Sequence, residues 1–368
     1  MRTVADKKDL QKAVQDAVRI AGQKSTLPIL EHVLLEAKGD HLAITAYDME
    51  AGIVQEIPAT TEAEGAVTVH GKSLRDLLKT LKKGELSLQA DAKSMVEVVQ
   101  GDVTATLNGL PAEEFPALPT FDGAQGFNLK GAEFFAALDR TLWAASKDET
   151  RAILTGVLLE VQDKRARLVA TDSYRLSIAE AGTVRTSQNL SVIIPAESLA
   201  LLRRLWKKPP KAFRVAIHEQ QFSISEGSRR LVTRLIEGQF PNCERVATAI
   251  DAQLPTSWQF RAGDALAACK RLETIAKQEA GKVVIVANGN LSLSTEAGDA
   301  GKLTQTVPAT VTGPVVTTAF NVWYLMNVLA CLPEDASCVM GLNCSLSTVS
   351  IRSPEVEGFR HYLAPMQL

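Results

Sequence analysis

The sequence predicts an α+β protein built from three repeated domains of about 120 residues, each with two helices among short strands. Strand-like segments end at acidic residues spaced 124 positions apart, at Asp48, Asp172 and Glu296. A second marker, Phe115-Pro116, recurs at Phe240-Pro241 with an offset of 125. Each third of the chain also repeats the same order of helical and alternating patterns, which is typical of α+β folds rather than of βαβ units.

In the first repeat, apolar residues at helical spacing predict helices over residues 10–21 and 74–81. Strict alternation of apolar and polar residues predicts strands over 42–46 and 96–107.

The second and third repeats follow the same order. Pro195 is expected to open a helix, because its fixed φ and missing N–H suit the first helical position. The predicted helices span 134–142, 199–205, 266–276 and 322–332, and predicted strands include 168–172, 283–286, 291–295 and 346–351.

Domain junctions are expected where Pro, Gly and Asp gather, near residues 119–126 and 251–256. We therefore expect domains over residues 1–122, 127–250 and 254–368.

The net charge is −2, from 40 Lys and Arg against 42 Asp and Glu, and taken alone it disfavours a nucleic-acid-binding protein, which is usually basic. The predicted helices nevertheless carry +10, so the rest of the chain carries −12. Rows of Lys and Arg without aromatic residues would contact phosphates without reading bases, although solvated helix faces explain each row taken singly. The helix over 322–332 has no basic residue, which weakens this interpretation for the third repeat. The candidate basic residues are Lys12, Arg19, Arg75, Lys79, Lys82, Arg203 and Lys207.

The five cysteines form no Cys-x-x-Cys pair and have no His at metal-ligand spacing, so we expect free, buried, reduced thiols and a cytoplasmic protein without a metal. The N-terminal segment is too charged for a signal peptide, and no apolar run approaches 18 residues, so neither secretion nor a membrane span is expected.

No motif indicates catalysis or a cofactor. Gly71-Lys72-Ser73 resembles the end of a phosphate-binding loop, but Ala66 stands where that loop needs glycine, which favours a strand-to-helix turn. The five histidines are scattered singly. Equivalent positions of the three acidic markers in three repeats favour structural turns over metal ligands.

Four strings resemble one family, the bacterial DNA polymerase III β subunit, which is the replication sliding clamp. They are Thr-Leu-Pro-Ile-Leu at 26–30, Ala-Thr-Asp-Ser-Tyr-Arg-Leu at 170–176, Gly-Gln-Phe-Pro at 238–241, and the terminal Tyr-Leu-Ala-Pro-Met-Gln-Leu at 362–368. The resemblance covers the whole chain in order, including the triplication.

The resemblance implies a DNA-clamp fold, in which three domains of antiparallel sheets and helices form a crescent and two crescents close head to tail into a homodimeric ring. Helices would line the hole around duplex DNA, which the ring holds by topology and without sequence specificity. It implies no catalysis of its own. It implies tethering of the replicative polymerase subunit, loading by a separate clamp loader, and binding of other proteins through Gln-Leu-x-Leu-Phe-like motifs.

The family also implies site residues at the matching positions. The partner groove would use Leu154, Thr171, Tyr174, Arg175, Leu176, Pro241, Arg245, Val246, Leu363, Pro365, Met366 and Leu368. Arg175, Arg245 and the Tyr174 hydroxyl could orient polar atoms of the bound motif. Lys24, Lys147 and Arg151 would approach DNA. Because Ala105 falls where some relatives place an aromatic residue at the dimer interface, Leu107 and Ile275 are expected to carry that contact.

Three departures from the family pattern bear on the specificity of the groove. Asn242-Cys243 stands where relatives commonly have an acidic residue and an aromatic residue, Ala364 where a bulkier residue is usual, and Gln367 where a basic residue is frequent. Three alternatives also stay open at this point. The tail could be a disordered or strand-packed terminus, the chain could be a peptide-binding scaffold without a closed dimer, and an enzyme with an unrecognised site would show convergent polar groups in one repeat only.

Overall fold

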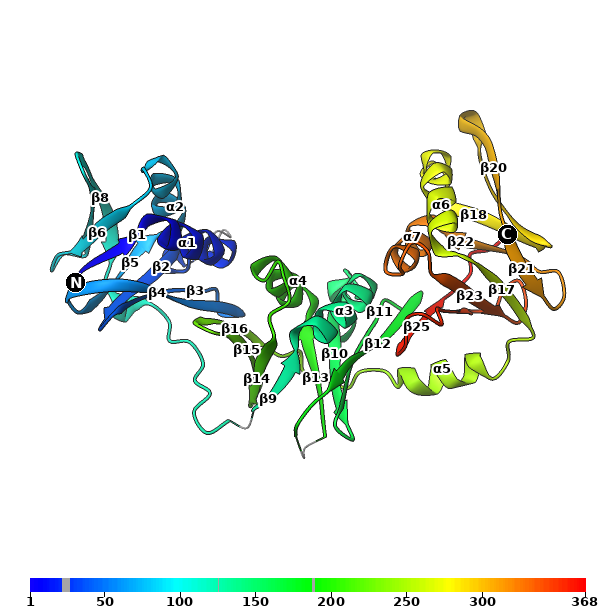
Figure 1. The fold of residues 1–368 in the computed structure, drawn as a ribbon, viewed down its shortest axis with the longest axis horizontal. Helices are drawn as coiled ribbons and strands as arrows, with labels where there is room; N and C mark the ends of the chain where they lie inside the picture. The colour runs from blue at the N-terminus through cyan, green and yellow to red at the C-terminus, as the bar shows by residue number, and fades with distance from the viewer. Residues whose placement is uncertain (22–26, 125, 187–188) are drawn as a thin grey trace. The chain divides into compact units, whose positions relative to one another are not determined.

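The chain consists of helices and antiparallel sheets, as the α+β prediction requires (Figure 1). Its residues divide into two compact units. The computed structural model describes residues 1–21, 27–124, 126–186 and 189–368. Unit 1 comprises residues 1–131 and 197–235, and unit 2 comprises residues 132–196 and 236–368.

Unit 1 is organised by one twelve-stranded sheet, whose order is β1-β6-β7-β8-β5-β2-β3-β4-β16-β15-β14-β9. Pairing of β4 with β16, from Gln55↔Arg229 to Ala51↔Thr233, joins strands far apart in the sequence. The strands are β1 Arg2–Asp6, β2 His32–Lys38, β3 His41–Tyr47, β4 Ala51–Ala63, β5 Gly65–His70, β6 Glu85–Ala90, β7 Met95–Gln100, β8 Val103–Leu110, β9 Gly126–Lys130, β14 Ala212–His218, β15 Gln221–Glu226 and β16 Arg229–Arg234.

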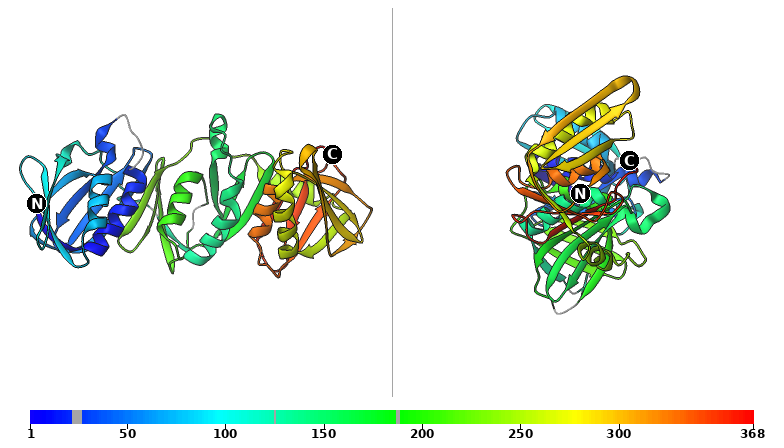
Figure 2. Two further views of the ribbon diagram at one scale, coloured as in Figure 1. Left: turned by 90° about the horizontal axis from the view of Figure 1, so that it is seen from above. Right: turned by 90° about the vertical axis from the view of Figure 1, so that its right-hand side faces the viewer.

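Helices α1 (Lys7–Ala21) and α2 (Gly71–Thr80) lie side by side over this sheet (Figure 2). Their apolar stripes are largely buried, with Leu10 and Leu74 both 0% exposed and Leu77 of α2 partly exposed. Burial of one such leucine contributes about 2 kcal/mol, so the 3.6-residue pattern that predicts each helix also fixes its inner face. The short helices η1 (Pro28–Glu31) and η2 (Ala112–Glu114) complete the first repeat, and α4 (Ala196–Leu205) belongs to the second.

Arg229 ties several elements of unit 1 together. It donates to Asp16 Oδ2 of α1 at 2.9 Å, to the Leu205 carbonyl oxygen at 2.6 Å and to Gln55 Oε1 of β4 at 3.0 Å. Its guanidinium also lies 5.2 Å from the centre of the Trp206 ring. Burial raises the pKa of the Asp16 carboxyl, whereas Arg229 and Arg19 act to lower it. Burial therefore disfavours the charged form of Asp16, and the interaction with Arg229 is the main one that offsets this desolvation.

Unit 2 contains a nine-stranded sheet of order β13-β10-β11-β12-β25-β24-β23-β17-β21 and a four-stranded sheet of order β20-β19-β18-β22. The strands are β10 Gly156–Gln162, β11 Arg165–Thr171, β12 Arg175–Thr183, β13 Leu190–Pro195, β17 Thr256–Arg261, β18 Lys282–Asn288, β19 Asn290–Ala297, β20 Gly301–Val307, β21 Ala309–Thr312, β22 Thr317–Asn321, β23 Ser337–Leu342, β24 Val349–Arg352 and β25 Phe359–Leu363.

The predicted helices of the later repeats are present, and α5 (Cys243–Asp251) is an additional helix that the sequence reasoning missed. With nine residues and only Cys243 and Ala247 buried, α5 has too narrow an apolar stripe to stand out as a periodic pattern. The other helices are α3 Gly131–Thr141, α6 Ala262–Ala276 and α7 Val322–Ala330, with the short helices η3 Leu142–Ala144, η4 Glu149–Thr155 and η5 Gly298–Ala300.

The acidic markers behave differently in the three repeats. Asp48 and Asp172 each end a strand and accept the backbone N–H groups two and three residues ahead, so both form the predicted turn. Glu296 instead lies inside β19, opposite Lys302, and the hairpin turns later. The prediction of a third acidic turn was wrong, because in this repeat the ladder continues past the marker and Glu296 forms an ion pair across it at 3.1 Å.

Two local predictions also needed correction. Pro195 is the last residue of β13, and α4 begins one residue later, because Pro195 still pairs with Gly156 in the sheet. Leu346 lies in a turn and is 66% exposed, so the last predicted strand starts only at Val349.

The cysteines are free, as expected, but not all buried. Cys344 is exposed and Cys331 is partly exposed, whereas Cys243, Cys269 and Cys338 are buried. Among the described residues, no three His, Cys, Asp or Glu side chains gather in a metal-binding arrangement. None of the described helices combines the length and apolar composition needed to span a bilayer.

Candidate partner-binding groove and nucleic-acid interface

A tight turn between β11 and β12 carries Tyr174, and three more predicted groove residues lie at the strand ends beside it: Thr171, Arg175 and Leu176. Asp172 Oδ1 accepts the N–H groups of Tyr174 at 2.9 Å and Arg175 at 3.0 Å. Thr171 Oγ1 donates to the Arg175 carbonyl oxygen at 2.7 Å. These bonds hold the backbone of the turn, and the Tyr174 side chain projects from it with 62% of its surface exposed.

Arg175 supports this turn from beneath. Its Nε donates to Asp172 Oδ2 at 2.8 Å, and its guanidinium carbon lies 4.1 Å from the centre of the Tyr324 ring and 5.2 Å from that of Trp143. Only 10% of the Arg175 side chain is exposed. A cation held between two rings and a carboxylate has little surface left for a peptide, so the geometry favours a positioning role over the direct contact expected from the sequence.

The C-terminal tail is pinned beside the turn. Leu363 ends β25, pairs with Arg175, and is fully buried. Beyond it, the Ala364 N–H donates to the Tyr174 carbonyl oxygen at 2.8 Å, and the Met366 N–H donates to the Ala319 carbonyl oxygen at 2.7 Å. The described tail is therefore strand-packed up to Leu363 and hydrogen-bonded beyond it, while Pro365 and Met366 stay partly exposed and Leu368 is 58% exposed.

The first turn of α5 forms the predicted rim. Asn242 Oδ1 accepts the Arg245 N–H at 3.1 Å and so caps the helix. Asparagine and aspartate cap helices about equally well, so this departure from the family pattern preserves the helix start. Pro241, Arg245 and Val246 are exposed, whereas Cys243 is buried against the sheet.

The inner face of α5 joins one apolar cluster with the strands below it. Cys243 and Ala247 pack there with Leu176 and Tyr362. Glu244 accepts hydrogen bonds from Arg360 at 2.9 Å and from Arg167 at 2.6 Å. The hydrogen bond from Arg360 is the larger cause of the lowered pKa of Glu244, and the bond from Arg167 is a smaller one. These ion pairs hold α5 against the strands that carry the two arginines.

The predicted groove residues thus fall into two sets. The inaccessible members could contribute only to a floor: Leu154, Thr171, Leu176 and Leu363 are at most 8% exposed, and the Arg175 side chain is 10% exposed. The accessible members are Tyr174, Pro241, Arg245, Val246, Pro365, Met366 and Leu368.

The structure adds Leu346 to this region, which the sequence reasoning did not select. Thr318 Oγ1 donates to the carbonyl oxygen of neighbouring Ser345 at 2.8 Å, so the turn that carries Leu346 is tied to β22. The next β22 residue, Ala319, accepts the Met366 N–H. Leu346 is 66% exposed on this anchored turn. The alternation of apolar and polar residues had placed it in the predicted strand 346–351, so no sequence pattern indicated that it is exposed in a turn.

The basic residues of unit 1 are accessible but partly neutralised. Lys12 and Arg19 lie on the outer side of α1. On α2, Arg75 and Lys79 each lie 2.9 Å from the Asp76 carboxylate, and these two hydrogen bonds lower the pKa of Asp76, with Arg75 the larger cause. Helix α2, which also contains Lys72, therefore carries three cations and one anion.

Two further basic residues lie just outside the helices predicted to carry them. Helix α2 ends at Thr80, so exposed Lys82 belongs to the following turn. Helix α4 ends at Leu205, and exposed Lys207 follows it. Arg203 stays on α4 and donates to the Lys207 carbonyl oxygen at 3.3 Å, an arrangement that suits the negative end of the helix dipole.

In unit 2, Lys147 and Arg151 lie on the connection between α3 and β10. Lys147 is exposed, and Arg151 pairs with Asp148 at 3.2 Å and donates to Ser173 Oγ at 2.9 Å. A residue expected near DNA is thus in contact with the turn that presents Tyr174. Lys24 lies outside the described residues.

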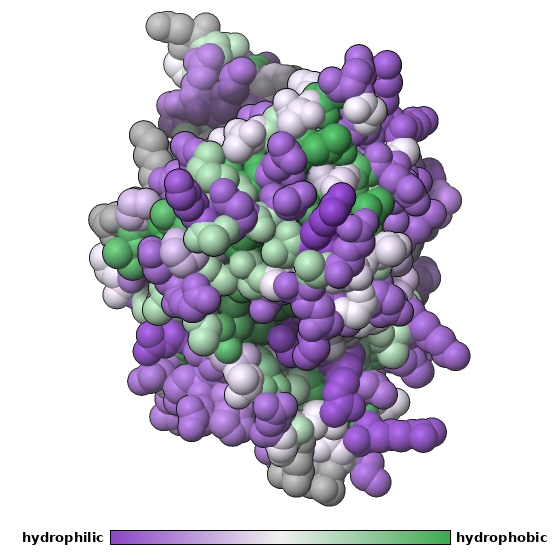
Figure 3. Space-filling view, turned by 90° about the vertical axis from the view of Figure 1, so that its left-hand side faces the viewer, coloured by the Kyte–Doolittle hydropathy of each residue, from purple (hydrophilic) through white to green (hydrophobic). Residues whose placement is uncertain are grey.

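Each unit also has an open strand edge near a predicted dimer residue. Residues 103–108 of β8 pair with β7 alone among the described strands, and partly exposed Leu107 lies there. In unit 2, β20 ends the four-stranded sheet, and the neighbouring helix α6 carries partly exposed Ile275. Figure 3 faces the end of unit 1 at which β8 lies and shows apolar and neutral side chains across the middle of that face.

Comparison with known proteins gives the same family along the whole chain. The domain models of the DNA polymerase III beta subunit match in order, the N-terminal domain at residues 1–119, the central domain at 128–242 and the C-terminal domain at 260–367. The beta sliding clamp of Synechocystis sp. is 29% identical over an alignment of 360 positions, and the match covers 91% of this chain and 91% of that protein.

Solved structures agree with this result. The Bacillus subtilis sliding clamp has a TM-score of 0.95 over 100% of this chain and 99% of its own, at 22% identity, which supports the fold. The Bartonella birtlesii sliding clamp, solved bound to griselimycin, is 27% identical with a TM-score of 0.92 over 100% of both chains. Triplicated sequence, α+β domains with antiparallel sheets and matching relatives therefore place this chain in the DNA polymerase III β subunit family, the sliding clamps of the bacterial replicase.

Proposed function

We propose that two copies of this chain close head to tail into a ring around duplex DNA, and that each copy tethers partners through one groove. The partners would be the replicative polymerase subunit, the clamp loader and other proteins with Gln-Leu-x-Leu-Phe-like motifs. The observation that carries the groove is the tail: Met366 and Leu368 stay accessible although the backbone is hydrogen-bonded to Tyr174 and Ala319.

The chemistry of the groove suits such a motif. Tyr174, Val246, Leu346 and Leu368 are all at least 50% exposed and offer apolar surface for leucine and phenylalanine side chains. Exposed Arg245 provides a donor for carbonyl oxygens of the peptide. Because the backbone supporting these side chains is already hydrogen-bonded, the peptide would bind a largely preformed surface.

The homodimer is supported by the two open edges. A strand edge in water leaves backbone donors and acceptors ready to pair with another chain, and proteins normally cover such edges. Pairing β8 of one copy with β20 of the other would close both edges and bury Leu107 and Ile275. A head-to-tail ring of two copies contains this contact twice. Each chain would contribute its β8 edge to one contact and its β20 edge to the other.

Contact with DNA would be electrostatic and independent of sequence. The exposed Lys and Arg residues of α1, α2 and the loops after α2 and α4 are suited to binding phosphates. Contacts to phosphates alone do not distinguish one base sequence from another. In this proposal the protein has no catalytic activity of its own and works in the cytoplasm, where the replicase acts. We also retain domains over 1–122, 127–250 and 254–368 as part of the proposal.

A peptide titration tests the groove. Fluorescence anisotropy of a labelled Gln-Leu-x-Leu-Phe peptide should show saturable binding to the full chain, and deletion of Pro365–Leu368 should abolish it. Arg75→Ala is the matched control, because it removes a cation from a helix of unit 1 and should leave peptide affinity unchanged. Undiminished binding after the deletion would place the groove elsewhere.

Light scattering tests the ring. Size-exclusion chromatography should give twice the chain mass of 39.7 kDa. Leu107→Asp or Ile275→Asp should shift the protein toward monomer, because a buried unpaired carboxylate is strongly unfavourable. A wild-type protein that remains monomeric at micromolar concentration would contradict the ring while leaving the groove to be judged by the peptide titration.

A further inference from the structure

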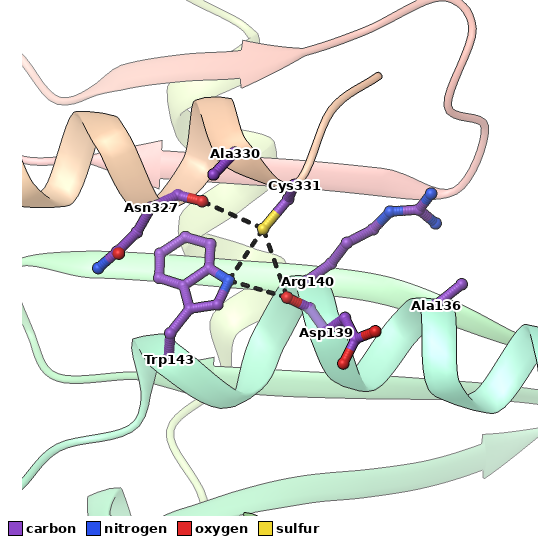
Figure 4. Close-up of a pocket in the computed structure, with 7 residues that line it drawn as sticks. All are labelled: Ala136, Asp139, Arg140, Trp143, Asn327, Ala330 and Cys331. Atoms are coloured by element: carbon purple, nitrogen blue, oxygen red, sulfur yellow. Dashed lines mark hydrogen bonds between the residues drawn. The ribbon is translucent and has the colours of Figure 1, made fainter. Parts of the chain in front are cut away.

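A cavity of about 460 Å³ lies between α3 and α7 in unit 2 (Figure 4). Cavities that bind small molecules in proteins commonly have volumes of about 300–1,000 Å³. None of its lining residues belongs to the predicted partner groove. They are Ala136, Asp139, Arg140, Trp143, Asn327, Ala330 and Cys331.

Arg140 lines this cavity and supplies its positive charge. Its Nε is buried and has no hydrogen-bond partner among the described residues. The guanidinium carbon lies 6.0 Å from the centre of the Phe359 ring, which holds the cation but accepts no conventional hydrogen bond. Burial lowers the pKa of Arg140, and this effect exceeds the opposing influence of Cys331 and Asp139. The buried Nε has no surface through which a ligand could reach it, so an incoming acceptor would bind the terminal nitrogens of this partly exposed guanidinium, whose positive charge favours an anion.

Trp143 gives the same cavity a flat apolar wall. Its Nε1 donates to the Asp139 carbonyl oxygen at 3.1 Å and to Cys331 Sγ at 3.0 Å, which fixes the orientation of the indole (Figure 4). Ala136 and Ala330 also line the cavity, with small side chains that leave it open. An aromatic ring packs well against such a wall.

We propose that the cavity between α3 and α7 binds a small aromatic carboxylate, with its ring beside Trp143 and its carboxylate on Arg140. The nearby Asp139 side chain disfavours ligands with several negative charges, so a monoanion fits best. The Asn327 amide can donate or accept one further hydrogen bond.

The same tryptophan connects this cavity to the turn that carries Tyr174. The Trp143 ring lies 5.2 Å from the guanidinium carbon of Arg175 and 5.1 Å from the centre of the buried His361 ring. Arg175 holds the Tyr174 turn through Asp172, and Tyr174 in turn accepts the tail N–H of Ala364. We therefore expect a ligand that moves Trp143 to change the environment of Tyr174. The link to peptide affinity rests on the proposed function, whereas binding in the cavity does not.

Fluorine NMR of the full chain tests both parts. The sequence has four tryptophans and four tyrosines, so 5-fluorotryptophan and 3-fluorotyrosine give few resonances, and Trp143→Phe and Tyr174→Phe assign the two that matter. The probe is 2-naphthoate. Naphthalene-2-carboxamide tests the charge, and cyclohexanecarboxylate tests the aromatic ring.

We expect 2-naphthoate to shift the Trp143 resonance in a saturable manner and to leave fully buried Trp258 unchanged. Arg140→Gln should weaken naphthoate binding about tenfold, the usual value of one charge-assisted hydrogen bond, and should leave carboxamide binding unchanged. Ala330→Phe, at an exposed position, should block both ligands by filling the cavity.

Several results would overturn the proposal. They are no saturation below about 10 mM naphthoate, equal affinity for the carboxamide, or an unchanged naphthoate affinity in a folded Arg140→Gln variant. An unmoved Tyr174 resonance at saturation would refute the connection to the turn but retain the site. If the labelled peptide fails to bind at all, the proposed groove fails, and the two fluorine signals still decide this inference independently.

Discussion

Replacing Arg229 should destabilise unit 1 strongly. Arg229→Met keeps the length of the side chain but removes the donors to the Asp16 carboxylate, the Leu205 carbonyl oxygen and the Gln55 amide oxygen. The Arg229 and Asp16 side chains are only 10% and 12% exposed, so water restores these bonds poorly. Removing one partner of a buried ion pair typically costs about 3–5 kcal/mol.

The magnitude converts directly into a melting temperature. For a unit of 150–250 residues, each kcal/mol shifts Tm by about 2–4 °C, so the melting temperature of unit 1 should fall by about 6–20 °C. Scanning calorimetry at pH 7 resolves this change. Asp16→Asn should cost less than Arg229→Met, because the amide oxygen can still accept one hydrogen bond.

A double-mutant cycle and a matched control sharpen the measurement. The double variant should be more stable than the sum of the two losses predicts, by about 1–3 kcal/mol, because the second substitution removes a charge already stranded by the first. Arg2→Met is the control, since its ion pair with Glu62 is more than half exposed and should contribute at most about 1 kcal/mol. A loss below about 1 kcal/mol for Arg229→Met, or strict additivity, would refute this account of the network.

Three further predictions concern pH, DNA and the groove. Burial, with Arg175 nearby, lowers the pKa of His361 from 6.5 to about 3, so folded protein keeps it neutral while the unfolded chain protonates it. The free energy of unfolding should therefore decrease as pH falls from 6.5 toward 3, by at most about 1.4 kcal/mol per pH unit. In urea unfolding, His361→Asn should remove this contribution to the pH dependence. An equal pH dependence in the wild type and the variant would contradict the prediction. Asp76→Asn removes the carboxylate that pairs with Arg75 and Lys79, so affinity for a short DNA duplex should rise. The slope of log affinity against log salt concentration should steepen by about 0.9. Weaker binding would count against DNA contact by α2. Leu346→Ser should weaken the labelled peptide about tenfold, the value of burying one leucine, and unchanged anisotropy would remove Leu346 from the groove.

Short-range patterns explain which parts of the fold were predictable. The helix around Leu74 follows from apolar spacing alone, because a single stripe must be buried for the helix to be stable. The turn at Asp172 follows from a side chain that accepts the N–H groups of the next residues. Helix α5 has no such strong signal, since its stability comes from Cys243 and Ala247 packing against strands distant in sequence.

For the candidate groove, too, the sequence indicated some properties and not others. Its membership could be carried over from the family strings, but exposure could not. Leu363 and Tyr174 lie in equally motif-like strings, yet one is fully buried and the other is 62% exposed. The difference arises because β25 pairs with β12 at Leu363, whereas the Asp172 turn directs Tyr174 outward.

By itself, the sequence determined three repeated α+β domains, basic helices in a nearly neutral chain and the clamp family. The repeats and the basic helices follow from periodicity, spacing and side-chain type, and the family was suggested by the resemblance of four short strings, all of which can be read along the chain without its tertiary structure. Only the tertiary structure decided that Arg175 is held beneath its turn, that Leu346 is exposed on an anchored turn, and that Arg140 lines a cavity while its buried Nε has no partner among the described residues. Each of these depends on elements from distant parts of the chain meeting in space, and no short stretch of sequence specifies such a meeting.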